Sequence, residues 1–256
     1  MNGDAPILEF DPSPTAMVEP HRVIDPIGEP PTRAVLCFFR HVIDRIRDRG
    51  TPVWFELEAA HGVHPVYRVE VGGEEIAVFH PGVGAPLAGA FLEEAIAHGC
   101  IRFVAVGTAG GLVSDLAMED VVVPTSAVRD EGTSYHYLPP SRYATPSPDA
   151  VEAIRSALRR HDIPFHSGRT WSTDGFYRET ANKVQRRVAE GCVTVEMEAA
   201  ALFAIAAFRD VSMGMLLTTS DDLSGEEWSG FLPDEQRDHD SGERLVQVAA
   251  EAVLAL

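Results

Sequence analysis

The sequence has few cysteines, no long apolar run and no recognisable secretion signal. Its three cysteines, Cys37, Cys100 and Cys192, are scattered over 256 residues. Such an odd, scattered set argues against a disulfide framework and for a reducing compartment. No apolar stretch is long enough to cross a bilayer, and the N-terminus lacks the basic segment and apolar block of a signal peptide. We therefore expect a cytoplasmic protein that is not inserted in a membrane.

Basic residues are also scarce relative to acidic ones. The chain has 21 Lys and Arg against 39 Asp and Glu, which gives a formal net charge of −18. A nucleic-acid duplex needs a basic footprint for its phosphates, so this composition disfavours nucleic-acid binding. An anionic substrate would have to bind a local group of arginines and backbone amides against the overall field.

Apolar runs alternate with amphipathic segments through most of the chain, and 45% of the residues are hydrophobic. The pattern predicts strands at residues 34–39, 53–57, 66–71, 76–79, 103–106, 120–124, 164–173, 193–196 and 213–219. It predicts helices at residues 40–48, 86–98, 149–161, 199–208 and from 242 onward. This alternation is typical of an α/β fold with a twisted, mostly parallel central sheet and helices on both faces. We find no repeat and no linker, so residues 34–256 are predicted to form one domain.

Residues 1–33 differ from the rest because they contain seven prolines and little periodicity. We expect an extended N-terminal arm. It would either lie on the surface of its own chain or reach a neighbouring subunit with His21 and Arg22.

Two pairs of carboxylates follow apolar strands. Glu196 and Glu198 flank Met197 where a strand gives way to an alanine-rich helix, and Asp221 and Asp222 follow the apolar run 213–219. Acidic groups beside a hydrophobic sheet are costly to place and usually have a task. We predict that Glu198 and Asp221 belong to a functional site.

Other candidate ligand contacts come from glycine-rich and aromatic segments. The turn with Gly82 and the stretch 107–111, which includes Gly107 and Thr108, would be loops whose backbone amides approach a ligand closely. Arg40, at a strand-to-helix junction, is placed to bind an anion or is simply solvated. Phe176, in a glycine-flanked segment, would stack on a flat heterocycle or cover the core.

Several other readings find little support. His61 and His64 have no third ligand at helical spacing, so no metal site is predicted. Ser134 and His136 do not form a nucleophile–base pair, and no nucleophile elbow precedes them. The glycine stretch 107–111 lacks the GxGxxG fingerprint of dinucleotide binding.

Four motifs in order, GVGAP, VGTAGGL, RDEGTSYHY and VEMEAAAL, resemble those of the purine/uridine phosphorylase superfamily of nucleoside phosphorylases and nucleosidases. The resemblance spans about residues 34–225 and implies a single-domain, phosphorylase/hydrolase-like α/β fold whose sheet is partly closed and barrel-like. It implies phosphorolysis of a nucleoside to a free base and (deoxy)ribose 1-phosphate, by a dimer or hexamer that uses phosphate as co-substrate and no cofactor. Hydrolysis, or nucleoside binding without turnover, remains an alternative.

The resemblance also assigns roles to the candidate residues, with Glu198 and Asp221 as the catalytic pair. Ribose would be bound by Met197, Glu198, Glu196 and Thr108, the base by Phe176, Arg178, Asp221 and Asp222, and phosphate by Arg40, Gly107, Thr108 and Gly82.

The chain also departs from the family pattern. The GDPxR phosphate loop is missing, and Ala105 stands where the family has an arginine, which leaves Arg40 with Arg22 and Arg33 as candidate phosphate ligands. Purine or pyrimidine specificity, and which of Asp221 and Asp222 faces the site, stay open.

Overall fold

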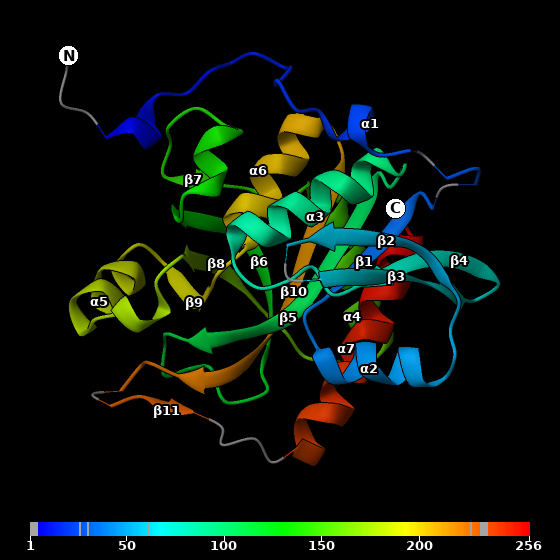
Figure 1. The fold of residues 1–256 in the computed structure, drawn as a ribbon. Helices are drawn as coiled ribbons and strands as arrows, with labels where there is room; N and C mark the ends of the chain where they lie inside the picture. The colour runs from blue at the N-terminus through cyan, green and yellow to red at the C-terminus, as the bar shows by residue number, and fades with distance from the viewer. Residues whose placement is uncertain (1–4, 26, 30, 61, 226, 231–234) are drawn as a thin grey trace.

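The centre of the molecule is a β-sheet that closes on itself (Figure 1). This computed structural model describes residues 5–25, 27–29, 31–60, 62–225, 227–230 and 235–256, with the backbone alone for 235–240. Five strands form the closed part: β5 (Arg102–Gly111), β6 (Val121–Asp130), β8 (His166–Thr173), β9 (Cys192–Glu196) and β10 (Ser212–Asp222). They pair in the order β10–β6–β8–β9–β5, and β5 also pairs with β10, which completes the ring.

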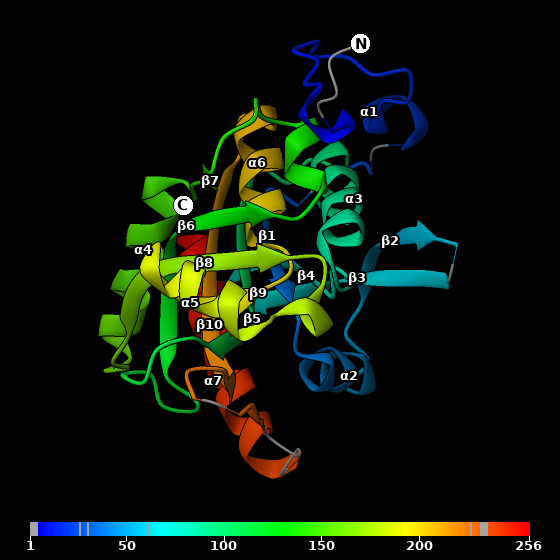
Figure 2. The same cartoon turned by 90° about the vertical axis from the view of Figure 1, so that its left-hand side faces the viewer.

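A wing of four further strands extends from β5. It consists of β1 (Arg33–Cys37), β4 (Glu74–Phe79), β3 (Gly62–Val71) and β2 (Val53–Ala59). Figure 2 shows the β2–β3 hairpin projecting from the body of the molecule. Two short strands, β7 (Tyr143–Ala144) and β11 (Ser229–Gly230), pair with β6 and β10.

The predicted α/β domain with a partly closed sheet is confirmed, and its pairing is more mixed than expected. Strands β4, β1, β5 and β10 are parallel to one another, as are β6, β8 and β9. The wing ends in antiparallel hairpins, one of them through the predicted turn at Gly72 and Gly73, whose φ angles are 63° and 85°. The ring closes through antiparallel contacts of β10 with β6 and of β5 with β9.

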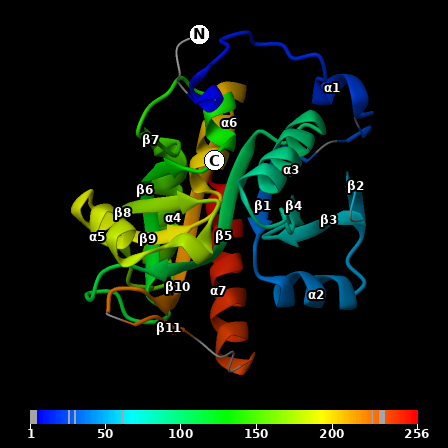
Figure 3. The ribbon, with the colours of Figure 1, turned by 60° about the vertical axis from the view of Figure 1, so that its left-hand side comes forward.

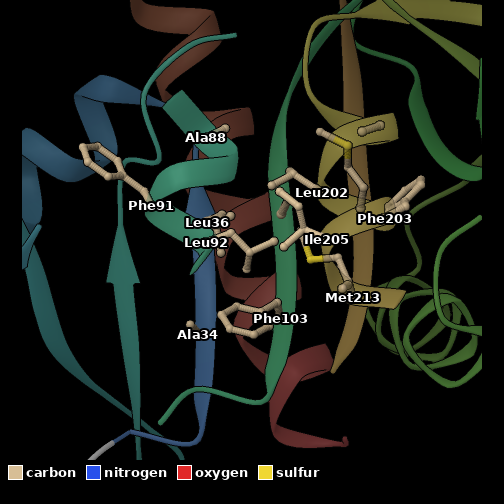
Figure 4. Packing of buried hydrophobic residues seen from close by; sticks show 14 of the residues in the cluster. Ala34, Leu36, Ala88, Phe91, Leu92, Phe103, Leu202, Phe203, Ile205 and Met213 are labelled. Atoms are coloured by element: carbon tan, nitrogen blue, oxygen red, sulfur yellow. The ribbon is translucent and has the colours of Figure 1, made fainter. Parts of the chain in front are cut away.

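Helices cover both faces of the sheet, as predicted. Their bounds are α1 (Pro20–Val23), α2 (Arg40–Asp48), α3 (Ala85–Ala97), α4 (Pro148–Arg160), α5 (Ala181–Ala189), α6 (Ala199–Arg209) and α7 (Glu235–Leu254), with short 3₁₀ turns η1 (Pro6–Leu8), η2 (Thr133–His136) and η3 (Phe176–Arg178). Side chains alternate across each strand, so Leu36 of β1 faces α3 and α6, whereas Val35 faces α4 and α7. Figure 4 shows the first of these two cores, with Leu92, Leu202 and Phe103 in it.

One predicted loop proves to be strand. Residues 107–111 continue β5 because this strand changes partners there: residues 102–106 pair with β1, and Gly110 and Gly111 pair with β9. The glycines leave room for this crossing. A Cβ on Gly107 would lie 2.9 Å from Phe38 Cβ, and one on Gly110 would lie 2.5 Å from Leu223 Cδ1. The glycines of this stretch therefore allow close packing of the chain, in addition to any contact with a ligand.

Other boundaries also differ from the prediction, and β3 already begins at Gly62 instead of residue 66. Strand β6 runs to Asp130 and β10 to Asp222, each further than its apolar run, and α7 begins at Glu235 instead of residue 242. In each of these last three cases the element continues through polar residues. Pairing with β7 and β11 supports the ends of β6 and β10, and the packed C-terminal part of α7 supports its polar start.

The N-terminal arm lies over the outer ends of α3 and α6 (Figure 3). Glu19 is 2% exposed, and its carboxylate is 3.5 Å from the Arg209 guanidinium, which also binds both oxygens of Glu93 at 2.7 and 2.9 Å. The arm is thus fastened to its own chain, and the domain boundary at residue 33 stays a prediction. Within the described part of the chain, no helix is long and apolar enough to cross a membrane. All three cysteines are free and buried.

Candidate functional site

Glu198 lies between the N-terminal ends of two helices. It lies two residues after the end of β9 and is the N-cap residue of α6, and its side chain is buried. Its Oε1 accepts a hydrogen bond of 2.5 Å from the amide of Gly84, the N-cap residue of α3. Gly84 has φ +90°, a backbone conformation that favours glycine. The carboxyl group of the residue that begins α6 is therefore bound to the positive end of α3.

The Glu196 side chain holds the start of α6 in place through hydrogen bonds. Its Oε2 accepts from the amides of Glu198 at 2.7 Å and Ala199 at 2.6 Å, which caps α6. Its Oε1 accepts from the Ser172 hydroxyl at 2.5 Å, and Ser172 Oγ in turn accepts from the Ala200 amide at 2.9 Å. Both oxygens of Glu196 are thus bound to the protein itself. Its predicted contact with ribose stays a prediction, whereas its contact with the start of α6 is direct.

Burial makes both carboxyl groups reluctant to ionise. Burial, and secondarily the charge of Glu196, raises the pKa of Glu198 to about 8, although the Gly84 and Met197 amides act in the opposite direction. Burial also raises the pKa of Glu196 against the opposing hydrogen bonds from Ser172, Ala199 and Glu198. Hydroxyl groups of a ligand that donate to Glu198 would favour its carboxylate form.

The carboxyl ends of β1 and β4, beside the middle of β5, form a second part of the site. Phe38 follows β1, packs over Gly107, and its ring lies 6.1 Å from that of His80, which follows β4. His80 Nδ1 accepts from the Gly82 amide at 3.0 Å, and burial lowers the pKa of this histidine. Gly82, Gly107 and the exposed Thr108 are therefore brought to one edge.

Arg40 begins α2 at this same edge of the sheet. Its side chain is 88% exposed and lies 3.6 Å from Asp44. The guanidinium is free to turn toward a ligand, because an exposed ion pair of this kind is weak.

Asp221 lies across the ring from β9. In the β10–β5 pairing it stands opposite Gly110, which in turn pairs with Val195, and its Oδ2 would be 3.2 Å from a Cβ on Gly110. Oδ2 accepts from the Trp228 indole at 3.0 Å, and Oδ1 accepts from the Ser220 hydroxyl at 2.9 Å. By contrast, Asp222 Oδ1 accepts from the Ser224 amide at 2.7 Å in an exposed turn. Asp221 is therefore the member of the pair that lies over the ring.

Comparison with known proteins decides the family. Residues 32–256 match the family model described as the phosphorylase superfamily. The chain belongs to this superfamily. It is 30% identical over 217 residues to a guanosine phosphorylase of Halorubrum lacusprofundi, which covers 84% of this chain and 89% of the relative. It is 30% identical over 228 residues to a uridine phosphorylase of Treponema pallidum, covering 81% and 87%.

A solved structure of a superfamily member has the same fold. The purine nucleoside phosphorylase of Toxoplasma gondii, crystallised with immucillin-H, matches 87% of this chain and 90% of its own with a TM-score of 0.74. At 19% sequence identity this likeness concerns the fold.

In the present chain the segment RDEGTSYHY, residues 129–137, is held together by its own hydrogen bonds, and we call it the brace. Arg129 is buried and donates to Ser134 Oγ and Pro139 O at 2.9 and 2.8 Å, and Glu131 accepts from the Ser134 amide at 2.9 Å. The Gly132 amide donates to Asp174 Oδ2 at 2.8 Å. This bond ties the brace to the loop that carries Phe176.

The aromatic residues and Arg178 are on the surface of that loop. Phe176 and Tyr177 are 50% and 87% exposed, and their ring centroids are 4.0 Å apart. Arg178 is also exposed. The structure does not bring these three side chains into contact with Glu198, so their predicted contacts with a base depend on a bound ligand.

Sequence reasoning missed two residues on the Asp221 side. Burial, and then the charge of Asp221, raises the pKa of Glu179 to about 7, while Lys183 opposes the shift. Trp228 binds Asp221 directly. Glu179 directly follows Phe176–Arg178, so the aromatic residues there could have drawn attention to it. Trp228 lies in a polar stretch without hydrophobic periodicity, so no sequence pattern indicated it.

Metal binding is not evident in the part of the chain that the structure describes, where no group of three His, Cys, Asp or Glu side chains is arranged for it. His64 packs against Phe91, with ring centroids 4.8 Å apart. His61 lies outside the described residues.

Proposed function

We propose that the protein is a nucleoside phosphorylase that cleaves the N-glycosidic bond with inorganic phosphate, giving a free base and (deoxy)ribose 1-phosphate. The observation that carries this proposal is the buried carboxyl group of Glu198, held between the ends of α3 and α6 beside Met197. The superfamily assignment and relatives named guanosine, uridine and purine nucleoside phosphorylase support it. The same names do not favour the hydrolytic or non-catalytic alternatives.

Glu198 would bind the sugar. Its Oε1 already accepts from Gly84, and both oxygens have further acceptor capacity for the 2′- and 3′-hydroxyls of ribose. Those hydroxyls donate hydrogen bonds, so they stabilise the carboxylate that burial disfavours. Met197, which is half-buried, would pack on the sugar ring.

Phosphate would bind at the edge formed by Gly82, Gly107, Thr108 and Arg40. Arg40 supplies a positive charge, and it begins α2, a nine-residue helix whose first amides face the same end. Helix N-termini bind anions through these amides and the aligned peptide dipoles. The N-terminus of α3 lies next to Gly82 and adds a second dipole. Two helix ends and one arginine would thus compensate for the missing family arginines.

The leaving base would face Asp221. As the bond breaks, negative charge develops on the base, and a proton donor there lowers the barrier. The side of the site that would face the nucleobase is acidic, because it holds Asp221 and Glu179, and the Glu179 carboxyl group is readily protonated. Such groups suit the ring nitrogens of a purine better than the carbonyl groups of a pyrimidine, which require donors that do not lose their protons. We therefore assign a purine nucleoside as substrate, with Phe176 stacking on it.

We also propose that the protein acts in the cytoplasm as a homo-oligomer, a dimer or a hexamer. Apolar side chains on the arm support an interface, since Met17, Val18 and Val23 are 98%, 71% and 68% exposed. Light scattering after size-exclusion chromatography measures the assembly, and a monomer at micromolar concentration would refute this part.

A nucleoside panel with and without phosphate tests the reaction. We expect guanosine or inosine to release base only when phosphate is present, with one ribose 1-phosphate per base, and Glu198→Ala to abolish release. The pair Asp221→Asn and Asp222→Asn provides a matched control, because only the first should slow the reaction. Base release that is indifferent to phosphate would identify a nucleosidase, and ligand binding without release would identify a binding protein.

A further inference from the structure

Trp228 lies on the hairpin that extends β10 beyond the ring. Strand β11 pairs with the end of β10, so that Gly230 stands opposite Asp221 and Ser229 opposite Asp222. The six-membered part of the Trp228 indole covers Gly230, where any Cβ would collide with it. The indole nitrogen donates to Asp221 Oδ2 at 3.0 Å.

Stability alone does not account for this tryptophan. Its side chain is 65% exposed, so most of its apolar surface stays in contact with water. A single exposed hydrogen bond contributes only about 0.5–1.5 kcal/mol to folding. The contact does, however, fix the orientation of one specific carboxyl group, because the ring is held against the hairpin backbone.

The hydrogen bond also distinguishes the two oxygens of Asp221. An indole N–H can only donate, so Oδ2 must be the accepting oxygen in either protonation state. The partner of Oδ1 is the Ser220 hydroxyl at 2.9 Å, and a hydroxyl can donate to a carboxylate or accept from a carboxylic acid. In a carboxylic acid the carbonyl oxygen is the better acceptor, so the indole contact favours Oδ2 as the carbonyl oxygen and Oδ1 as the oxygen that carries the proton.

We propose that Trp228 is a positioning residue for the leaving base: by occupying Oδ2 it makes Oδ1 the oxygen of Asp221 that carries and delivers the proton. This inference rests on the proposed function, since it assumes that a purine departs toward Asp221. As the C1′–N9 bond breaks, its electron pair moves onto the purine, a phosphate oxygen bonds to C1′, and the proton on Oδ1 passes to purine N7.

The variant Trp228→Phe tests this, because it keeps an aromatic side chain on the hairpin and removes the N–H together with part of the ring system that covers Gly230. Trp54→Phe is the matched control, since its indole also donates one hydrogen bond, to Glu29 O at 3.1 Å, on the wing of the sheet. Each variant is assayed with guanosine and with 7-methylguanosine, in the presence of phosphate. The base of 7-methylguanosine already carries a positive charge and leaves without receiving a proton at N7.

We expect Trp228→Phe to lower kcat for guanosine about tenfold, a fraction of the 10²–10⁴-fold that general acid catalysis supplies, with KM unchanged within about twofold. For 7-methylguanosine, kcat should stay at the parent value, and Trp54→Phe should change neither substrate. Circular dichroism and thermal unfolding check that both variants fold.

Two results would overturn the inference while leaving the proposed function intact. Equal losses on both substrates would mean that Trp228 only maintains the structure, and no loss on either would mean that its N–H is irrelevant. A parent protein that turns over no nucleoside with phosphate would instead refute the proposed function, and this inference with it.

Discussion

Replacing Glu198 with glutamine measures what the buried carboxyl group costs the fold. Below about pH 4.5, Glu198 is protonated in both the folded and the unfolded chain and contributes no pH dependence. Between pH 4.5 and 8 the unfolded chain releases the proton while the folded protein keeps it, so stability falls as pH rises. At about 1.4 kcal/mol per pH unit, this corresponds to a loss of up to about 5 kcal/mol by pH 8, after which the dependence levels off.

Urea unfolding of the parent and of Glu198→Gln between pH 5 and 9 tests this cost. Trp171, which is fully buried, provides the fluorescence signal. We expect the variant to match the parent near pH 5 and to be more stable above pH 8, because glutamine keeps an acceptor for the Gly84 amide and cannot ionise. The difference between the two proteins reports Glu198 together with its interaction with Glu196, because the charge of Glu196 also acts on Glu198.

Glu70→Gln is the control for the loss of one negative charge, since Glu70 is exposed on β3. It should leave the pH dependence of the parent unchanged. The reasoning fails if Glu198→Gln and the parent lose stability with the same slope from pH 5 to 8. That result would mean that Glu198 ionises in the folded protein as easily as in the unfolded chain.

Three further predictions concern the site and the arm. Nucleoside affinity, measured by calorimetry, should increase as pH rises from 6.5 to 9, because hydroxyl donors need the ionised Glu198, whose pKa is about 8; a flat profile would contradict this. Gly110→Ala should lower kcat at least about tenfold in a folded protein, because its Cβ would lie 2.5 Å from Leu223 Cδ1 and 3.2 Å from Asp221 Oδ2. Kinetics equal to those of the parent would show that the closed sheet accommodates the added methyl group without disturbing the site. Arg209→Ala should speed protease cleavage within residues 5–25 about tenfold, equal to ~1.4 kcal/mol of local opening, because it removes the cation that Glu19 and Glu93 share. The exposed Arg47→Ala serves as control, and equal cleavage rates in the two variants would refute the prediction.

Features set by neighbouring residues could be predicted from the sequence. The apolar runs around Leu36, Phe103 and Leu216 are short and rich in Val and Leu, as is typical of strands of a central sheet that are buried on both faces. The position of Glu198 between a strand and a helix follows from the change in pattern at Met197. In both cases the determining information lies within a few residues of chain.

Contacts between distant segments could not be predicted in this way. The ring closes where Gly110 pairs with Val195, residues far apart in the sequence whose side chains carry no pairing signal. The same limit applies to Trp228, which is near Asp221 only because a hairpin folds back. The motif RDEGTSYHY contributed to the family resemblance but did not indicate its local role, in which Arg129 uses its guanidinium to hold the segment together.

Helix α6 begins at the sugar-binding candidate Glu198 and ends at Arg209, which grips the arm. Its eleven residues span about 16 Å. A helix that is buried from Ala199 to Ala206 behaves as a stiff rod, so a displacement at one end reaches the other with little loss. The contact that holds the arm and the candidate sugar ligand thus lie at the two ends of one helix.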